Sequence, residues 1–170
     1  MKIIFSHGKE GSPNGSKSKI LKKVAEDLRH DFIAIDFTNC KDAAARVDLL
    51  KKELRGYADE QIVLVGSSMG GYVSASVSNE YETAGLFLIA PALYLRPLEY
   101  EVQHFECKAK NILVRHGWDD ELIPPENSIK FCKQHNAALI IEKDNHRMSE
   151  TKDSLKRSFE DFLIKINTNN

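Results

Sequence analysis

The sequence has 170 residues, enough for one domain, and a domain of this size buries roughly 70% of the surface that its unfolded chain exposes. Its 24 lysines and arginines nearly balance its 25 aspartates and glutamates, which argues against nucleic acid or an anionic membrane as a partner. Three cysteines without paired spacing argue against a disulfide framework and a zinc knuckle. We therefore expect one domain over residues 1–170, without metal or cofactor, that binds a small molecule.

The beginning of the chain, MKIIFSHGKE, has only three consecutive apolar residues after its lysine. That run is too short for the core of a signal peptide, and no later stretch approaches the length of a membrane span. We expect a cytoplasmic protein, and the sequence carries no signal for its oligomeric state.

Six short apolar runs recur along the chain and predict strands that are buried on both faces. Segments between them show helical periodicity, in which apolar residues three or four positions apart form one stripe. This alternation predicts a doubly wound α/β domain with a mostly parallel six-stranded sheet and helices on both faces. The runs are 3–5, 32–35, 62–65, 86–89, 112–114 and 139–141, and the clearest helical stripes lie within 20–28, 43–54 and 155–166.

The segment 91–110 breaks this rhythm, because it joins two predicted strands through a stretch with two prolines and little helical signal. We expect it to form a short cover over the edge of the sheet, comparable to a small cap, and not a separate domain.

In open parallel sheets, ligands bind at the carboxyl ends of the strands, so the residues just after each apolar run are the place to seek function. The first such loop, GKEGSPNGSKSK at 8–19, is rich in glycine and ends in Lys17 and Ser18. Its spacing does not match the phosphate-binding pattern G-x-x-x-x-G-K-[ST], because Gly11 and Gly15 are one residue too close and Ser16 precedes the lysine. Taken alone, the loop is typical of a flexible turn that ends in a helix cap.

The third run is followed by GSSMGGY, in which Gly66, Ser68 and Gly70 form the pattern G-x-S-x-G between a strand and a helix. A serine held at positive φ in such a tight turn brings the residues two before and two after it together, and only small residues fit there. This steric argument selects Ser68 over Ser67, whose corresponding pair would be Val65 and Met69. Ser68 is therefore the candidate nucleophile, at the amino end of a helix.

A serine nucleophile needs a base, and the base needs an acid that orients it. HGWDDELIPP follows the fifth run and KDNHRMSE follows the sixth, so an aspartate and a histidine come at carboxyl ends of strands. By composition alone, Asp119 and Asp120 are equivalent candidates for the acid.

With these motifs the chain resembles a small α/β-hydrolase over nearly its whole length, reduced to the core of that family. In the family the acid commonly lies in H-G-x-x-D-x-x-[VI]-P, which the residues from His116 to Pro124 match with Asp120 as the acid. The resemblance also implies His146 as the base, and the order Ser, Asp, His is the one this fold uses. It implies an oxyanion hole formed by the backbone N–H of Met69 and that of Gly8 or Lys9, because HGK at 7–9 resembles the His-Gly segment of the family.

The function implied is a serine hydrolase that cleaves carboxylic esters or thioesters through an acyl-enzyme, with a small acyl substrate. With little cap, the site is expected to be open. Side chains predicted to line it are Tyr94, Leu95, Trp118 and Leu122, of which Trp118 lies next to the proposed acid.

Two alternatives come from another class of protein. One is a non-catalytic binding module with the same fold, and the other is a flavodoxin-like module that binds phosphate or a nucleotide through residues 11–18. A metal site formed by His7, His116, Asp120 and His146 is also conceivable at one edge of the sheet, but no paired spacing of ligands supports it.

Overall fold

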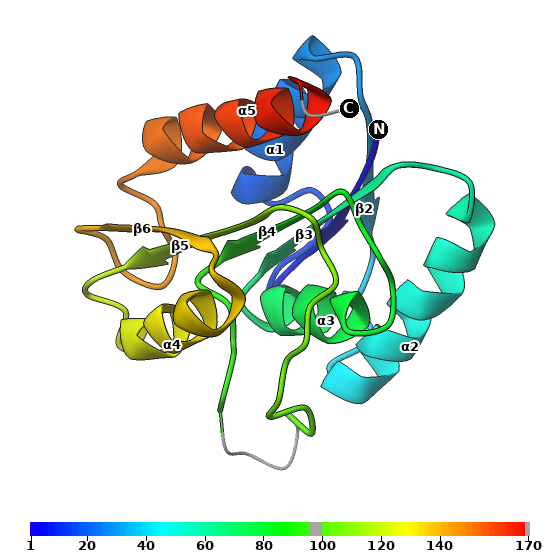
Figure 1. Cartoon of the computed structure of the whole chain (residues 1–170). Coiled ribbons are helices and arrows are strands. Elements are labelled where there is room, and N and C mark those ends of the chain that lie inside the picture. Colours follow the sequence, from blue (N-terminus) through cyan, green and yellow to red (C-terminus); the bar gives the residue numbers. More distant parts are fainter. Residues whose placement is uncertain (96–99, 169–170) are drawn as a thin grey trace.

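Every predicted apolar run forms a strand in the computed structural model, which describes residues 1–95 and 100–168 (Figure 1). The strands are β1 (Lys2–Ser6), β2 (Asp31–Ile35), β3 (Ile62–Ser67), β4 (Gly85–Ile89), β5 (Ile112–Gly117) and β6 (Ala138–Glu142). The helices are α1 (Ser16–Asp27), α2 (Ala43–Leu54), α3 (Met69–Ser78), α4 (Pro125–His135) and α5 (Lys152–Thr168), and a short 3₁₀ helix, η1 (Arg55–Tyr57), follows α2. None of the helices within the described ranges is long and apolar enough to cross a membrane.

The strands form one sheet in the order β2-β1-β3-β4-β5-β6, and every neighbouring pair is parallel. The predicted doubly wound α/β fold is therefore confirmed, and the sheet is parallel throughout. The chain leaves β1 toward one edge to form β2 and then returns to the other side of β1 to form β3. The crevice at this reversal of strand order, beside the carboxyl ends of β1 and β3, is where ligands bind in such sheets.

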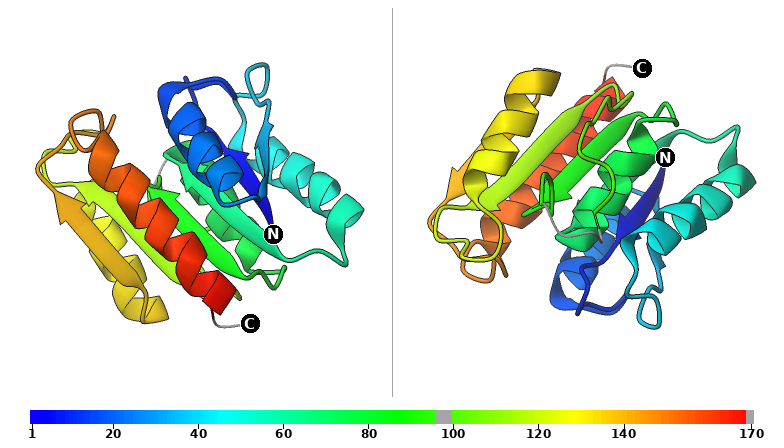
Figure 2. Two further views of the ribbon diagram at one scale, coloured as in Figure 1. Left: turned by 90° about the horizontal axis from the view of Figure 1, so that it is seen from above. Right: turned by 90° about the horizontal axis from the view of Figure 1, so that it is seen from below.

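Successive residues of a strand point to opposite faces, and here both faces are covered by helices. Ile3 and Phe5 pack toward α1 and α5, which lie side by side on one face, whereas Ile4 packs toward α2, α3 and α4 on the other face (Figure 2). This two-sided burial explains why the strands are continuous apolar runs and do not alternate with polar residues.

The prediction that all six runs are buried on both faces was wrong for β2 and β6. These two strands end the sheet, and their residues are exposed or only half-buried. A sheet that does not close into a barrel must have two edge strands, and a local apolar run does not show which strands these are.

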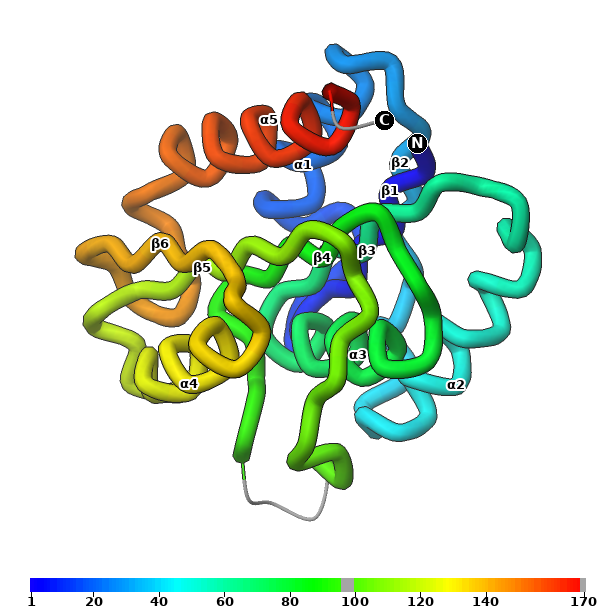
Figure 3. The backbone as a smooth tube through the Cα atoms, viewed as in Figure 1, coloured from blue at the N-terminus to red at the C-terminus, as the bar shows by residue number. Residues whose placement is uncertain are grey.

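The connection from β4 to β5 was predicted as a cap-like segment, 91–110, of which residues 96–99 lie outside the described part of the chain. Its described residues run along α3 and α4 (Figure 3). The rings of Tyr100 and Phe105 meet Tyr72 of α3 edge to face, with centroids 5.0 and 6.1 Å away, and the Val102 N–H donates to the Tyr72 hydroxyl at 2.8 Å. This packing holds the connection beside the carboxyl end of β3.

Candidate active site

Ser68 is the single residue between β3 and α3 and forms the sharp turn that joins them. Its backbone angles are φ 55° and ψ −122°, whereas Ser67 is the last residue of the strand. Positive φ is costly for a residue with a side chain and is retained where the surroundings enforce it. The turn thus presents Ser68, and not Ser67, at the apex, as the glycine spacing predicts.

Two glycines make this turn possible through close backbone contact. A Cβ on Gly66 would lie 2.2 Å from the carbonyl oxygen of Gly70, and a Cβ on Gly70 would lie 2.0 Å from the carbonyl oxygen of Ser6 at the end of β1. Neither obstacle can rotate away, because both are backbone atoms. The spacing G-x-S-x-G is therefore required here by contact within the turn and also by contact with β1.

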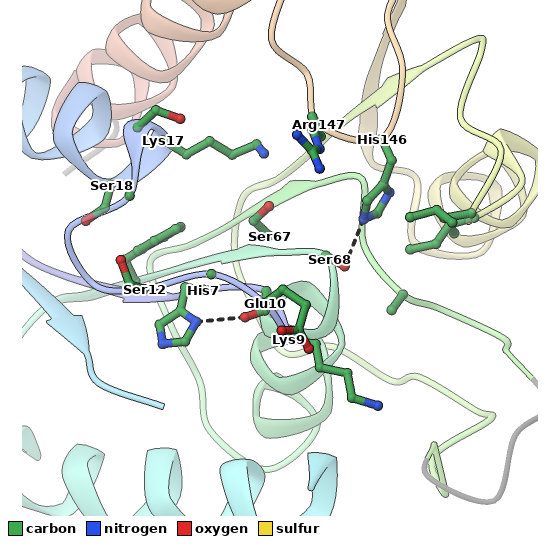
Figure 4. Close-up of a pocket in the computed structure, with 18 of the residues that line it drawn as sticks. His7, Lys9, Glu10, Ser12, Lys17, Ser18, Ser67, Ser68, His146 and Arg147 are labelled. Atoms are coloured by element: carbon green, nitrogen blue, oxygen red, sulfur yellow. Dashed lines mark hydrogen bonds between the residues drawn. The ribbon is translucent and has the colours of Figure 1, made fainter. Parts of the chain in front are cut away.

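Ser68, His146 and Asp120 form a hydrogen-bonded row. His146 Nε2 lies 2.9 Å from Ser68 Oγ, and His146 Nδ1 lies 2.7 Å from Asp120 Oδ2 (Figure 4 shows the first contact). Because a carboxylate accepts and does not donate, Nδ1 carries the proton and Nε2 is left to accept from the hydroxyl. Side chains that follow three different strands are thus arranged for transfer of a proton from the serine.

Asp120 is almost completely buried, and its carboxylate is held from several sides. Oδ1 accepts from the N–H groups of Leu122 and Ile123, each at 2.9 Å. Burial alone would raise the pKa of Asp120, but hydrogen bonds from His116, His146 and a backbone N–H outweigh it and hold the pKa well below its usual range. Asp120 is therefore an anion at neutral pH.

Asp119, the alternative candidate for the acid, is exposed, and its backbone N–H donates to the carbonyl oxygen of Asp144 at 3.0 Å. No hydrogen bond joins its side chain to His146 within the described residues. Of the two adjacent carboxylates, only Asp120 belongs to the row.

A second histidine contacts the same carboxylate. His116 is fully buried, and its Nε2 lies 3.0 Å from Asp120 Oδ2 and 3.0 Å from the carbonyl oxygen of Ile123. These acceptors place a proton on Nε2, so Nδ1 accepts from the Ser128 hydroxyl at 2.7 Å. His116 thereby ties the loop that carries Asp120 to α4.

His7 lies apart from this row. Its Nδ1 donates to the carbonyl oxygen of Gly8 at 2.7 Å, and its Nε2 accepts from the Phe37 N–H at 3.0 Å. The four residues considered for a metal site are thus engaged in two separate hydrogen-bonded groups, and no cluster of metal-binding side chains occurs in the described ranges.

The candidate oxyanion donors lie beside Ser68. Met69 is the first residue of α3, and an N–H in the first turn of a helix has no acceptor within the helix. A Cβ on Gly8 would come within 3.2 Å of Ser68 Cβ, so the backbone of the loop after β1 passes directly against the serine, and Lys9 follows in the same loop. The two segments predicted to supply the N–H groups therefore both lie beside Ser68.

Arg46, which no sequence motif singles out, supports this loop. It is fully buried on α2, and its guanidinium donates to carbonyl oxygens of His7 at 2.9 Å and Gly8 at 3.3 Å, and to those of Phe37 and Cys40. These bonds hold the carbonyl groups of the loop against α2. The signal was present in the sequence, because Arg46 interrupts the apolar stripe of that helix.

Residues 2–103 match the uncharacterised protein family UPF0227. The chain belongs to this family. None of the curated proteins matches it.

Solved structures show the same fold. This UPF0227 protein is similar to a protein of Xanthomonas campestris pv. campestris that is provisionally assigned to the hydrolases of the α/β superfamily, with 29% identity, coverage of 96% of this chain and 98% of that chain, and a TM-score of 0.89. It also resembles Est1E from Butyrivibrio proteoclasticus, with 16% identity, coverage of 98% and 88%, and a TM-score of 0.79. A third similar structure is an α/β serine hydrolase without lid from Xanthomonas campestris. It has 16% identity, coverage of 96% of this chain and 81% of that chain, and a TM-score of 0.79. The fold is that of a small α/β-hydrolase, and the resemblance stated from the sequence is confirmed.

A cleft of about 720 Å³ opens in front of Ser68 and His146 in this UPF0227 protein. One wall consists of the loop after β1 and the beginning of α1, and the other is largely apolar. The apolar wall contains Ala92, Leu95, Tyr100, Leu122 and Ile123.

Two of the side chains expected in the cleft lie elsewhere. Trp118, the first residue after β5, is 56% exposed, and Tyr94 packs edge to face on Phe105 with its ring under the ammonium group of Lys130. Neither belongs to the lining, whereas Leu95 and Leu122 do. Sequence position places a residue near a strand end but does not set the direction of its side chain.

Proposed function

We propose that this protein is a serine hydrolase that cleaves carboxylic esters or thioesters through an acyl-enzyme intermediate. The observation that carries the proposal is the continuous row from Ser68 Oγ through both ring nitrogens of His146 to Asp120 Oδ2, with contacts of 2.9 and 2.7 Å. Nucleophile, base and orienting acid are thereby within hydrogen-bond reach in the order that acyl transfer requires.

In the first step Ser68 Oγ attacks the acyl carbon while His146 Nε2 takes its proton, and the Asp120 carboxylate stabilises the imidazolium. Negative charge develops on the carbonyl oxygen, where the N–H of Met69 and that of Gly8 or Lys9 would donate. Loss of one such donor typically costs about 3 kcal/mol in the transition state. The imidazolium then protonates the leaving alcohol or thiol, and water repeats the sequence to release the acid.

The cleft favours a short acyl group, or one that projects from a larger molecule. It is open to solvent and shallow enough that Leu122, on its apolar wall, remains 70% exposed. An apolar strip of this size accommodates a few methylene groups and does not surround a long chain.

Labelling with a fluorophosphonate probe tests the nucleophile. We expect wild type to be labelled and Ser68→Ala not to be, whereas Ser149→Ala, outside the cleft, should label like wild type. A panel of para-nitrophenyl esters and thioesters of graded chain length should show turnover that decreases for long acyl groups. Wild type without label and without turnover would support a non-catalytic binding module instead.

The identity of the acid is tested by two amide substitutions. Asp120→Asn is expected to lower kcat by about 10³-fold, because an amide no longer holds His146 in the correct tautomer. Asp119→Asn removes the same charge from the neighbouring exposed residue, and kcat for para-nitrophenyl butyrate should stay within about twofold of wild type. A larger loss in Asp119→Asn than in Asp120→Asn would reverse the assignment.

A further inference from the structure

The cleft extends beyond Ser68 along the glycine-rich loop to the beginning of α1. Gly15, Ser16, Lys17 and Ser18 line this part, and Arg147, the residue after His146, closes it from the opposite side. These residues are not used in the acyl transfer derived above. We refer to this part of the cleft as the α1 end.

Two cations face each other at the α1 end. Figure 4 shows the side chains of Lys17 and Arg147 extending toward one another above Ser67. Neither side chain forms an ion pair within the described ranges. Burial lowers the pKa of Lys17, and the positive charges of Arg147 and Lys152 lower it further.

The acidic groups nearby are already engaged. Asp144 raises the pKa of Lys17 by its charge, but its carboxylate accepts from the N–H groups of Asn145, Glu150 and Thr151 and from the Thr151 hydroxyl. Glu10, on the cleft wall, is exposed and pairs with Lys41 at 3.3 Å. The negative charge of Asp144 offsets part of the positive charge, but one carboxylate stands against three cations, Lys17, Arg147 and Lys152, so the α1 end keeps a net positive charge.

The polar groups there also lack acceptors of their own. α1 begins at Ser16 with Gly15 as its cap, without a side-chain capping bond and without an acidic residue in the first turn, so its free N–H groups and positive dipole end meet the cleft. Independently, Ser67 is only 6% exposed, lines the cleft, and makes no side-chain hydrogen bond to the described residues. Because its oxygen is not among the fully buried side-chain atoms without a partner, the small exposed part of Ser67 includes the hydroxyl, which is available to a ligand in the cleft.

We propose that the α1 end binds an anionic group of the substrate, a carboxylate or a phosphate, while the ester carbonyl lies at Ser68. The inference rests on the proposed function and narrows its substrate class to esters or thioesters that carry a negative charge. Lys17 and Arg147 would supply charge-assisted hydrogen bonds, and Ser67 and the first turn of α1 would supply neutral donors.

Matched pairs of esters test this subsite. Para-nitrophenyl hexanoate and the mono-para-nitrophenyl ester of adipic acid differ only by a carboxylate in place of the terminal methyl group. Butyrate esters of para-hydroxybenzoic acid and of its methyl ester place the charge on the leaving group instead. For at least one pair, Lys17→Gln should lower kcat/KM for the anionic member by about 10-fold and for the neutral member by less than about twofold.

Reversing the charge of Lys17 should strengthen the effect, and a substitution of the neighbouring Lys19 serves as the control. Lys17→Glu should increase the loss for the anionic ester to about 100-fold. Lys19→Gln, on the same helix but exposed and outside the cleft lining, should leave the ratio between the two esters unchanged. Equal effects of Lys17→Gln on both members of both pairs, or no effect on any of them, would overturn the proposal.

Measuring anion binding to a variant that lacks the nucleophile tests this proposal separately from the proposed function. Nuclear magnetic resonance titration of Ser68→Ala with inorganic phosphate and with propionate should shift the amide signals of residues 15–18, and the affinity should fall about 10-fold when Lys17→Gln is added. The ligand that binds with the higher affinity indicates whether the α1 end prefers a phosphate or a carboxylate. Absence of any shift at 15–18 would refute the anion subsite even if ester cleavage is observed, whereas lack of labelling and cleavage with intact anion binding would refute the hydrolase alone.

Discussion

Replacing His146 with alanine is expected to lower kcat for ester hydrolysis by about 10⁵-fold or more, with KM nearly unchanged. The imidazole is the only base within hydrogen-bond distance of Ser68 Oγ among the described residues. Without it, the serine hydroxyl remains protonated at neutral pH and is a poor nucleophile. Steady-state kinetics with para-nitrophenyl butyrate, beside a thermal melt that checks the fold, measures the effect.

His104→Ala is the matched control, because it removes an imidazole that is exposed, contacts Glu106 and does not line the cleft. Its kcat should equal that of wild type. If His146→Ala kept more than about one hundredth of wild-type turnover, the row of contacts at Ser68 would not be the catalytic apparatus.

The substitution Gly70→Ala is expected to prevent stable folding. The new methyl group would lie 2.0 Å from the carbonyl oxygen of Ser6 and 2.7 Å from that of His7, both in the backbone. To relieve this steric clash, the amino end of α3 must move away from the end of β1, and this movement separates packed elements of the core. We expect a loss of more than about 4 kcal/mol, observed as insoluble protein or as a much lower midpoint of urea unfolding.

Gly56→Ala provides the comparison, because no atom lies within 4 Å of the position that its Cβ would take and its φ is not positive. Its stability should stay within about 1 kcal/mol of wild type. A Gly70→Ala variant that unfolds at the wild-type concentration of urea would contradict the close approach of β1 and α3.

The fold was predictable because its signals are local. Continuous apolar runs such as 62–65 indicate strands covered on both faces, and the helical stripes between them indicate crossovers that make a sheet parallel. The edge positions of β2 and β6 were not predictable in this way, since the run at 32–35 is as apolar as those in the middle of the sheet. Strand order is decided by how elements distant along the chain pack.

The candidate site was predictable in part. The glycines around Ser68 select that serine through contacts within five residues, and the resemblance to α/β-hydrolases indicated Asp120 and His146, which the structure brings into contact with it. Trp118 is a counterexample, because its position next to Asp120 suggested the cleft although its side chain lies in solvent. Adjacent residues in a loop point in different directions, and only the loop's backbone path sets which direction each takes.

By itself, then, the sequence determined the kinds of elements, their parallel arrangement and the residue at the apex of the turn, because periodicity and steric crowding act between near neighbours in the chain. Only the tertiary structure decided that Arg46 holds the loop after β1, and that Lys17 and Arg147 face each other across one cleft. These contacts join segments separated by tens of residues, so they depend on the packing of α1, α2 and the loop before α5 around the sheet. No local pattern encodes such packing, and the charge distribution of the cleft follows from it.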